Sequence, residues 1–476
     1  MDATNQKAID RKARMQLSPV PATYRPAEIR IHDFEEALIL HTPAAARAEA
    51  ARCLHCPTAP CQAACPLHND IGGALALLEA GDINGAAQLY RETNPQPEAC
   101  GRLCPQSFCQ DACTLNKVGK PIDTRHLEAF VTTYQRRTTG VPLPEIAPAT
   151  GKKVAVVGSG PAGLAVAEYL ARKGHQVVVY ERHSHPGGLL VYGIPKFKLS
   201  LESVEAKVHW LKELGVHFEC GVTIGKDISM AQLWEEYNAL FLGIGSQEHT
   251  LPGIPGETLE GIHKATEFLC RGNLPAAMLP PEWREPLTVG ARVHVLGGGN
   301  TAIDCLRTAL RLPGVQEATC YYRRSKAEMP AGEDEYQHAI EEGAAFEWQV
   351  CPTAFVGDAE GKICAVVYQR MSLCEPDESG RCRPVPISGS EFTVEADTVI
   401  LALGYRLDHT LASQVPGLAL NSRGMIAVTD RSTGETSVPG LFAAGDVVRG
   451  ADLLSPAMAD ALSVAAAMDA YLQREA

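Results

Sequence analysis

The chain has 476 residues, of which 45% are hydrophobic and 21% are charged, and its formal net charge at neutral pH is −13. This length suits about three ordinary domains, and the composition is typical of a globular protein that buries full cores. The negative charge argues against nucleic acid or a membrane surface as the main partner. Neither a secretory signal nor a run of 18 apolar residues occurs, so we expect a cytoplasmic protein.

Two cysteine blocks mark the first part of the chain. Together they contain eight of the 16 cysteines, and a helix-like stretch over residues 72–92 separates them. The first block reads Cys53-x2-Cys-x4-Cys-x3-Cys65-Pro, and the second reads Cys100-x3-Cys-Pro-x3-Cys-x3-Cys113. Thiolates at such spacings hold iron–sulfur clusters, and a reducing compartment disfavours disulfides. The alternative is zinc, but zinc favours paired Cys-x2-Cys elements and only one such pair is present.

The order of the cysteines suggests how two clusters would share them. In bacterial ferredoxin runs, the cysteine that precedes a proline serves the other cluster. We therefore expect the first cluster on Cys53, Cys56, Cys61 and Cys113. The second cluster would use Cys65, Cys104 and Cys109, with Cys100 as a further candidate.

A proline-rich connector over residues 141–148 leads into a repeated α/β pattern. Strand, glycine-rich turn, helix and strand follow one another from Lys152, and the pattern restarts at Arg292. Two later apolar strands, VILALG and LFAAGD, are expected to complete the first α/β unit. The predicted fold class is α/β, with two nested Rossmann-like dinucleotide-binding domains preceded by a helical iron–sulfur domain. The predicted limits are 1–145 for the helical domain, 146–287 with 396–476 for the first dinucleotide domain, and 288–395 for the second.

The first dinucleotide motif is a strand that runs into GxGxxG at Gly158, Gly160 and Gly163. These glycines serve a tight turn, close approach of the backbone to a pyrophosphate, and close packing of the next helix on the strand. A second strand ends 18 residues after the last glycine in Glu181, where a ribose hydroxyl needs an acceptor. The helix turns its positive end toward the phosphates. It begins with two further candidates, Pro161 and Ala162.

The second motif is a GxGxxA run at Gly297, Gly299 and Ala302. Its following strand ends in Arg323 and Arg324, where the first motif has an acid. Arginine at this place suits a 2′-phosphate, so we expect a preference for NADP over NAD. The alternative is that both arginines only solvate the end of the strand.

Two such sites in this nested order match flavoproteins that hold FAD in the first unit and a nicotinamide in the second. Gly188, Leu189 and Gly193 lie in a glycine-rich stretch where a flat ring system can lie against backbone. Gly445 and Asp446 resemble a late motif whose aspartate contacts the ribityl-phosphate side of the flavin. No CxxC or CxxxxC motif follows Gly188 or precedes Asp446, so a disulfide reductase is not expected. No side chain is predicted to be catalytic, because the cofactors themselves supply the chemistry.

Several longer stretches together make the chain resemble a known family: GRLCP, VVGSGPAGL, HPGGLLVYGIPKFKL, LGGGNTAID, YRRS and MPAGEDEYQHAIEEG. Over almost its whole length the chain resembles the small (β) subunit of bacterial NADPH-dependent glutamate synthase. The wider family includes the N-terminal half of dihydropyrimidine dehydrogenase and the FAD subunits of related transhydrogenases. The resemblance implies FAD, NADPH and two [4Fe–4S] clusters.

The resemblance also implies roles for single residues. Its FAD contacts would be Gly158, Gly160, Gly163, Glu181, Gly188 and Asp446. Its NADPH contacts would be Gly297, Gly299, Asn300, Thr301, Arg323 and Arg324. The family often gives one cluster a non-cysteine ligand beyond the last cysteine, which here would be Glu128 in place of Cys100. The alternative is that Glu128 is a solvated helix residue.

The function that the resemblance implies is electron entry. The chain would oxidise NADPH at FAD and pass electrons through the clusters to a large catalytic subunit, that of glutamate synthase in glutamate biosynthesis. Two departures from the family leave the partner open, namely Cys100 in a long second block and Ala461-Leu462 where a Gly-Arg pair is frequent. The alternative is a reductase subunit of a dihydropyrimidine dehydrogenase-like or transhydrogenase complex, with another FMN-containing acceptor. A cluster-bearing scaffold without enzymatic activity would not need two intact nucleotide motifs.

Overall fold

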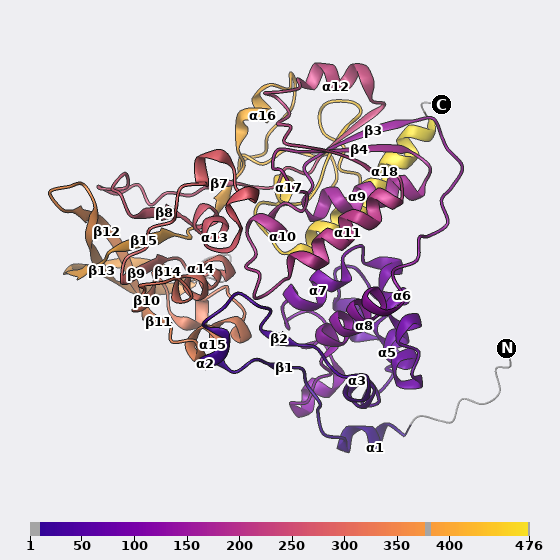
Figure 1. Cartoon of the computed structure of the whole chain (residues 1–476), viewed down its shortest axis with the longest axis horizontal. Coiled ribbons are helices and arrows are strands. Elements are labelled where there is room, and N and C mark those ends of the chain that lie inside the picture. Colours follow the sequence, from indigo (N-terminus) through magenta and orange to yellow (C-terminus); the bar gives the residue numbers. More distant parts are fainter. Residues whose placement is uncertain (1–9, 377–381, 475–476) are drawn as a thin grey trace.

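The computed structural model describes residues 10–376 and 382–474. Its first part is helical, as predicted, and lies at one end of the molecule (Figure 1). The helices are α1 (Arg11–Gln16), α2 (Ala27–Arg30), α3 (Pro43–Ala50), α4 (Pro60–Ala64), α5 (Ile71–Ala80), α6 (Ile83–Thr93), α7 (Pro97–Leu103), η1 (Thr114–Val118) and α8 (Thr124–Thr138). A short antiparallel pair, β1 (Thr23–Tyr24) and β2 (Leu38–Ile39), lies among them.

Capping residues start the helices that surround the cysteine loops. Asp70 and Asp82 precede α5 and α6, and each accepts a hydrogen bond from the backbone amide three residues further on, at 2.9 and 2.8 Å. Such caps satisfy amides that the first helical turn leaves without partners. The two helices then pack with α8 around a core that includes Leu75, Leu78 and Leu127. This core supports the loops that carry the cysteines.

A five-stranded parallel sheet forms the first dinucleotide unit. Its order is β17 (Leu441–Ala443), β6 (Ala239–Leu242), β3 (Lys153–Val157), β4 (Gln176–Glu181) and β5 (His217–Cys220). The helices of this unit are α9 (Pro161–Arg172), α10 (Leu189–Tyr192), α11 (Leu201–Glu213), α12 (Met230–Glu236), α16 (His409–Ser413), α17 (Asp446–Arg449) and α18 (Leu454–Arg474). Helices α9 and α18 share one buried core with the sheet, in which Leu164, Phe241 and Met458 lie. The strands are nearly continuous apolar runs, as expected for a parallel sheet that is covered on both faces.

A second five-stranded parallel sheet lies beside the first. Its order is β11 (Ala345–Trp348), β10 (Glu317–Tyr322), β9 (Arg292–Leu296), β15 (Thr398–Leu401) and β8 (Ile262–Lys264). Its helices are α13 (Ala265–Asn273), α14 (Asn300–Leu310) and α15 (Glu333–Glu341), with short 3-10 turns η2 (Ala276–Met278), η3 (Pro281–Trp283) and η4 (Lys326–Glu328). The predicted α/β class with two nested Rossmann-like units is confirmed.

One strand was assigned to the wrong sheet. The VILALG segment forms β15, which pairs with β9 and β8 of the second sheet, whereas LFAAGD supplies β17 of the first. An apolar strand fits either sheet, and only the tertiary pairing decides between them. The chain crosses between the units where β7 (Glu248–His249) pairs antiparallel with β16 (Tyr405–Arg406). We therefore propose that the second unit extends from β7 to β16.

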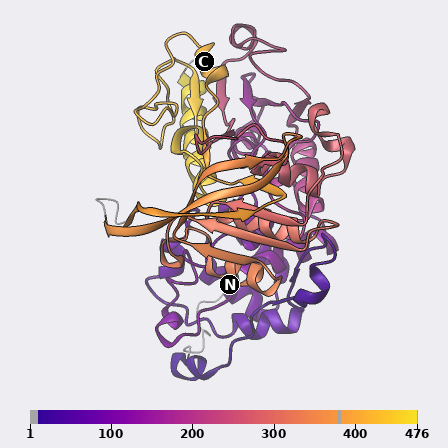
Figure 2. The ribbon, with the colours of Figure 1, turned by 90° about the vertical axis from the view of Figure 1, so that its left-hand side faces the viewer.

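A three-stranded antiparallel sheet projects from the second unit. It consists of β12 (Val350–Gly357), β13 (Ile363–Pro376) and β14 (Cys382–Glu395). Figure 2 shows the β13–β14 hairpin extending away from the rest of the molecule. Within residues 10–376 and 382–474, none of the helices combines the length and the apolar character that crossing a bilayer requires.

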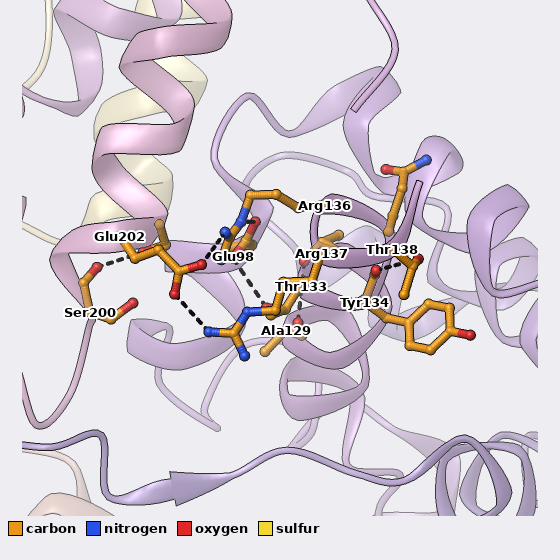
Figure 3. A network of polar contacts seen from close by, with 12 residues as sticks. Glu98, Ala129, Thr133, Tyr134, Arg136, Arg137, Thr138, Ser200 and Glu202 are labelled. Atoms are coloured by element: carbon orange, nitrogen blue, oxygen red, sulfur yellow. Dashed lines mark hydrogen bonds and ion pairs between the residues drawn. The ribbon is translucent and has the colours of Figure 1, made fainter. Parts of the chain in front are cut away.

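Ion pairs attach the helical part to the first dinucleotide unit. Arg136 near the end of α8 donates to Glu98 at 2.8 Å and to Glu202 of α11 at 2.6 Å, and Arg137 donates to Glu202 at 2.7 Å. Figure 3 shows these side chains bridging the two helices, with Thr133 donating to Glu98 from below. Three of the four charges belong to the helical part, so the bridge fixes how α8 lies against α11.

A second attachment runs from the segment around α2 to the second unit. Arg30 is buried, and its Nε donates to Glu342 Oε1 at 2.6 Å. The Tyr24 ring lies 4.2 Å, between centroids, from the His338 ring of α15. The helical part therefore contacts both dinucleotide units, through partly exposed ion pairs to the first and through the buried Arg30–Glu342 pair to the second.

Candidate cofactor sites

The structure brings four thiols together at the outer side of the helical part. We call Cys53, Cys56, Cys61 and Cys113 the outer thiol set. The pKa of Cys53 is raised to about 12, mainly by burial and to a smaller extent by the thiols of the other three members. The pKa of Cys61 is raised to about 11, mainly by burial, and the thiol of Cys113 makes the next largest contribution. All four thiols also pack against the same core of the helical part, and the pKa shifts place them within electrostatic range of one another.

The loop that carries the outer thiol set bends sharply. His55 and Ala59 both adopt positive φ angles, of 45° and 39°, which non-glycine residues rarely do. Cys61 then sits in α4, and Cys113 caps η1. Such strained backbone persists where surrounding structure imposes it, commonly at ligand sites.

A second group of thiols lines a cavity between the helical part and the start of α18. Cys65, Cys104 and Cys109 face it, together with Glu128 from α8. We call these four residues the inner thiol set. Cys65 therefore lies with the second block although it belongs to the first in sequence, and Cys100 also borders the cavity.

Glu128 enters the inner cavity as a buried carboxyl group. Its Oε1 accepts hydrogen bonds from Asn94 Nδ2 at 2.8 Å and from Asn69 Nδ2 at 3.1 Å. Burial raises the pKa of Glu128 well above its usual value, and the charge of Cys104 adds to the shift. The two amides hold one oxygen of a carboxyl group that lines the cavity.

Cys100 is placed differently from Glu128. Its thiol is almost fully buried, lies 3.7 Å from Asn94 Oδ1, and forms a hydrogen bond with Cys104. That bond is the main reason why the pKa of Cys104 is lowered. Cys100 thus supports a neighbouring sulfur in addition to bordering the cavity.

The donor chemistry of both sets fits iron–sulfur clusters. Thiolates are the ligands that iron–sulfur clusters take, and an ionised carboxylate can supply an anionic oxygen in place of one thiolate. In residues 10–376 and 382–474, no three His, Cys, Asp or Glu side chains converge closely enough for a single metal ion. A cluster of several irons is wider than one ion, so its ligands stand farther apart.

The first glycine loop forms a cradle between β3 and α9. Gly158 has φ +99°, and a Cβ there would lie 2.5 Å from Gly243 O of the neighbouring strand end. A Cβ at Gly163 would collide with Gly158 O, so the helix packs directly on the turn. At Gly160, by contrast, nothing lies within 4 Å of an added Cβ. The loop is thus closed everywhere except where a pyrophosphate would approach, next to Pro161 and Ala162 at the start of α9.

Glu181 at the end of β4 is buried against the same loop. Its Oε2 accepts from the Ser159 amide at 3.2 Å, and its Oε1 accepts from the His183 amide at 2.9 Å. Because backbone amides hold both oxygens, the orientation of the carboxylate is fixed before any ligand arrives. A group held in this way can receive ribose hydroxyls at the edge of the cradle.

The remaining candidates of the first unit surround the open side of this loop. A Cβ on Gly188 would lie 2.7 Å from Gly160 Cα, so the glycine-rich stretch lies directly on the cradle. Leu189 starts α10 and is partly exposed, and Gly193 ends it. A Cβ on Gly445 would meet the methyl group of Ala162 at 3.0 Å.

Asp446 begins α17 beside Gly445. Burial raises the pKa of this carboxyl to about 7, and the negative charge of Asp452 contributes. A carboxyl group that is reluctant to ionise can donate as well as accept a hydrogen bond.

The second glycine loop repeats the first between β9 and α14. Gly297 has φ +138°, and a Cβ there would collide with Ala402 O, whereas an added Cβ at Gly299 meets nothing within 4 Å. Asn300 and Thr301 form the first turn of α14, and Asn300 Oδ1 accepts from the Gly332 amide at 3.2 Å. The space above Gly299 is thus open in the same way as that above Gly160.

The arginines after β10 differ in exposure. Arg323 is exposed, whereas Arg324 is half-buried and its Nε donates to Cys382 O at 2.9 Å. Arg323 is therefore the more readily available of the two for a ligand phosphate. Both stand at the end of the strand that corresponds to β4 of the first unit.

Several residues at these sites gave no signal in the sequence. Asn69 and Asn94 hold Glu128, and Ser455 borders the inner cavity with its Oγ 3.5 Å from Cys104 Sγ. Lys198 of the first unit forms ion pairs with Asp304 at 2.9 Å and with Glu335 at 3.0 Å in the second. All of these contacts join distant parts of the chain. Lys198, Asp304 and Glu335 lie in the shared stretches HPGGLLVYGIPKFKL, LGGGNTAID and MPAGEDEYQHAIEEG, to which the sequence assigned no such contact.

Comparisons with known proteins agree with this arrangement. Residues 152–461 match the family model described as pyridine nucleotide-disulphide oxidoreductase, and residues 30–140 match the one described as dihydropyrimidine dehydrogenase domain II, 4Fe-4S cluster. The glutamate synthase [NADPH] small chain of Halomonas elongata is 39% identical over 91% of this chain and 92% of its own length. The NADP(+)-dependent formate dehydrogenase subunit beta of Moorella thermoacetica is 36% identical over 88% of this chain and 60% of its own length.

A solved structure shows the fold of the dinucleotide units. FprA from Mycobacterium tuberculosis in complex with NADPH superposes with a TM-score of 0.58 and 22% identity. The match covers 68% of this chain and 85% of FprA. At this identity the likeness concerns the fold alone.

Proposed function

The chain belongs to the pyridine nucleotide-disulphide oxidoreductase family and to its group of glutamate synthase small chains and their relatives, and on that basis we propose how its sites act together. It is a flavin- and nicotinamide-dependent oxidoreductase with a 4Fe–4S domain. We propose that it oxidises NADPH and delivers electrons one at a time to a separate protein. When bound, FAD accepts a hydride and iron–sulfur clusters carry single electrons.

A contact between the inner thiol set and the flavin unit supports this order. Cys104 Sγ lies 3.5 Å from Ser455 Oγ in the first turn of α18. Two residues further along, Ala457 packs beside Gly445, where an added Cβ would lie 3.7 Å away. One helical turn therefore separates the proposed flavin site from the inner thiol set. This contact is the observation that carries the proposal.

We propose roles for the site residues on the same basis. Gly160 and Gly299 leave room for the pyrophosphates of FAD and NADPH, and Glu181 receives the ribose hydroxyls of FAD. Arg323, the exposed arginine, meets the 2′-phosphate of NADPH. We further propose that Glu128 rather than Cys100 completes the inner set. The side-chain amides of Asn69 and Asn94 hold the carboxylate of Glu128 at the cavity, whereas the thiol of Cys100 is hydrogen-bonded to Cys104.

We propose the large chain of a glutamate synthase as the partner. The chain aligns with a glutamate synthase small chain over nearly the full length of both, which favours the same division of labour between subunits. A second candidate is another FMN-containing acceptor enzyme. The 36% identity to a formate dehydrogenase subunit supports this second candidate, because it shows that similar chains are named as subunits of different complexes.

The experiment that tests the function uses the full chain purified without oxygen. We expect about eight irons and one FAD per chain, as two [4Fe–4S] clusters require. NADPH should reduce ferricyanide through the isolated chain, without glutamate formation from glutamine and 2-oxoglutarate. Adding a glutamate synthase large chain should start glutamate formation. Zinc without acid-labile sulfide would refute the cluster assignment.

A variant of the inner thiol set distinguishes loss of electron transfer through the clusters from a wrong choice of partner. Cys109→Ser should leave reduction of the flavin by NADPH unchanged and should stop delivery to the large chain. If the unchanged chain reduces ferricyanide but never supports glutamate formation with the large chain, the second candidate partner is favoured.

A further inference from the structure

The two thiol sets lie at different distances from the flavin unit. Cys65 and Cys104 of the inner set pack against the core that α9 and α18 share with the first sheet. The members of the outer set pack against the core of the helical part, which Cys65 and Cys109 also contact, and none of them is among the residues that pack against the core of the flavin unit. If electrons leave the flavin unit through the inner set, as proposed above, the outer set is the last stop before another protein. The surface beside the outer set therefore decides what can dock there.

Helix α1 lies on this surface and is attached to the cysteine loop itself. Arg11 donates to Leu54 O at 3.0 Å and to His55 O at 3.2 Å, and Arg14 donates to Cys53 O at 2.8 Å. No residue of α1 is buried. Figure 1 shows the helix at the end of the helical part that points away from both dinucleotide units. A helix that buries nothing but is tied to a cofactor loop remains available for a partner.

The 3-10 turn η1 borders the same thiols on another side. Cys113 caps it, and Thr114 Oγ1 lies 3.1 Å from Cys56 Sγ. Val118 is 49% exposed, and Gly119 and Lys120 continue the exposed surface. Segments 10–17 and 111–120 therefore flank one thiol set, and we call them together the exit surface.

The exit surface is basic although the chain as a whole is acidic. These segments contain five cations and two carboxylates, in a protein whose net charge is −13. The cations are Arg11, Lys12, Arg14, Lys117 and Lys120, and the carboxylates are Asp10 and Asp111. Glu79 neutralises Arg14 at 2.8 Å. Among the described residues no ion pair engages Lys12, Lys117 or Lys120.

Exposed apolar side chains accompany these charges. Met15 and Leu17 are 38% and 43% exposed, beside the cations of α1. Methionine and arginine are enriched at protein interfaces, and complementary charge accelerates the encounter of two proteins. A local positive field on a negative molecule also orients an approaching acidic partner toward this end.

We infer that the exit surface is the docking site of the electron-accepting partner, and that the partner meets it with an acidic, partly apolar face. This inference rests on the proposed function, since it takes the outer thiol set as the last cofactor site. It adds the place and the charge of the contact.

The test uses two forms of one protein as electron acceptor. Native cytochrome c is basic, and succinylation of its lysines makes it acidic while the haem stays the same. Under anaerobic conditions the holoenzyme with NADPH should reduce the succinylated form faster than the native form. Raising the salt concentration should narrow the difference, because exposed charges are screened within about 8 Å at 0.15 M.

Charge reversal on the exit surface should invert this preference. Lys117→Glu with Lys120→Glu should lower kcat/KM for succinylated cytochrome c by roughly tenfold, within the range for electrostatic steering. Lys12→Glu should act in the same direction and is independent of η1. The matched control is Lys226→Glu with Lys362→Glu, the same change of charge on exposed lysines of the dinucleotide units. Reduction of the flavin by NADPH without any acceptor should stay the same in all variants.

The outcomes separate this inference from the proposed function. A holoenzyme whose flavin NADPH does not reduce would contradict the proposed function itself. Normal flavin reduction with an unchanged acceptor preference in both exit-surface variants would overturn the docking site. A second result would also overturn the docking site: the chain binds anionic phosphatidylserine vesicles, and the lysine variants abolish this binding but leave the acceptor preference unchanged. The surface would then serve a lipid.

Discussion

The two glycine loops share one backbone geometry but lead to side chains of opposite charge. In each, the first glycine has a positive φ and abuts the end of a neighbouring strand, and the second glycine faces open space. The next strand then ends in buried Glu181 in the first unit and in exposed Arg323 in the second. The comparison leads us to propose that the loop determines where a pyrophosphate fits, and that the side chain at the strand end determines which nucleotide the site prefers.

The loops differ at their third position. Gly163 packs so closely on Gly158 that an added Cβ would collide with its carbonyl oxygen, whereas the second unit has Ala302 at the equivalent place. We therefore expect α9 to lie closer to its turn than α14 does. The first loop is the less tolerant of change, and the predictions below test that asymmetry.

The largest effect is expected for Gly163→Ala. The new methyl group must displace α9 from the turn, and overpacking of this kind costs about 3 kcal/mol of the free energy of unfolding. Chemical denaturation should show that loss, and absorbance at visible wavelengths should show loss of FAD.

The matched change in the second loop is Ala302→Gly. It should cost only about 1 kcal/mol, the difference in helix propensity, and should leave the flavin content unchanged. Equal losses of stability in the two variants would contradict the asymmetry between the loops.

Alanine variants of the second glycine of each loop should be equally stable, but each should weaken binding of a different nucleotide. Gly160 and Gly299 have φ angles of −66° and −89°, which alanine adopts without strain, and nothing lies near an added Cβ. Gly160→Ala should fold normally but lose FAD. Gly299→Ala should keep FAD and raise the KM for NADPH by roughly tenfold, equivalent to about 1.4 kcal/mol. Loss of FAD from both variants would show that the loops do not serve separate nucleotides.

Arg323→Ala tests the charge at the end of the second loop's strand. A charge-assisted hydrogen bond contributes about 1.5–3 kcal/mol, so the KM for NADPH should rise by roughly 10- to 150-fold. The KM for NADH, which lacks the 2′-phosphate, should change little. Arg324→Ala is the matched variant and should have the smaller effect, since that side chain is already bonded to Cys382 O. Equal losses with NADPH and NADH would show that Arg323 does not contact the 2′-phosphate.

Local motifs could be predicted from the sequence because their partners lie close along the chain. The spacing of Gly158, Gly160 and Gly163 is enough to imply the strand, turn and helix that the structure shows. The division of the cysteines between two clusters rests on spacing in the same way, and the structure brings Cys65 to Cys104 rather than to Cys53.

Contacts between distant segments could not be predicted in this way. The apolar run that forms β15 fits either sheet equally well, and pairing with β9 rather than with β6 depends on the whole fold. Ser455 reaches Cys104 across 351 positions of the chain. The exit surface gave no signal either, because six-residue α1 is too short to show a helical period and buries no apolar side chain.

The last effect is a pH dependence of stability at Asp446, which lies at the first loop. Burial raises the pKa of its carboxyl to about 7 in the folded chain, whereas an unfolded aspartate ionises near 3.9. Between about pH 4 and pH 7 the unfolded chain has therefore lost a proton that the folded chain keeps. Stability from this group falls as the pH rises through that window and is constant above it.

Asp446→Asn should remove this dependence, because an amide does not titrate. In flavin-free protein, the free energy of unfolding of the variant, measured relative to the unchanged chain, should be about 1–2 kcal/mol higher at pH 8 than at pH 4. The expected difference is this small because the side chain is half-buried and solvent screens part of the cost of burying its charge. Asp452→Asn should lower the pKa of Asp446 and move the window to lower pH, because Asp452 contributes to the shift. Urea denaturation at pH 4, 6 and 8 measures all three proteins. A difference between Asp446→Asn and the unchanged chain that is the same at every pH would mean that the carboxyl ionises as freely in the folded chain as in the unfolded one.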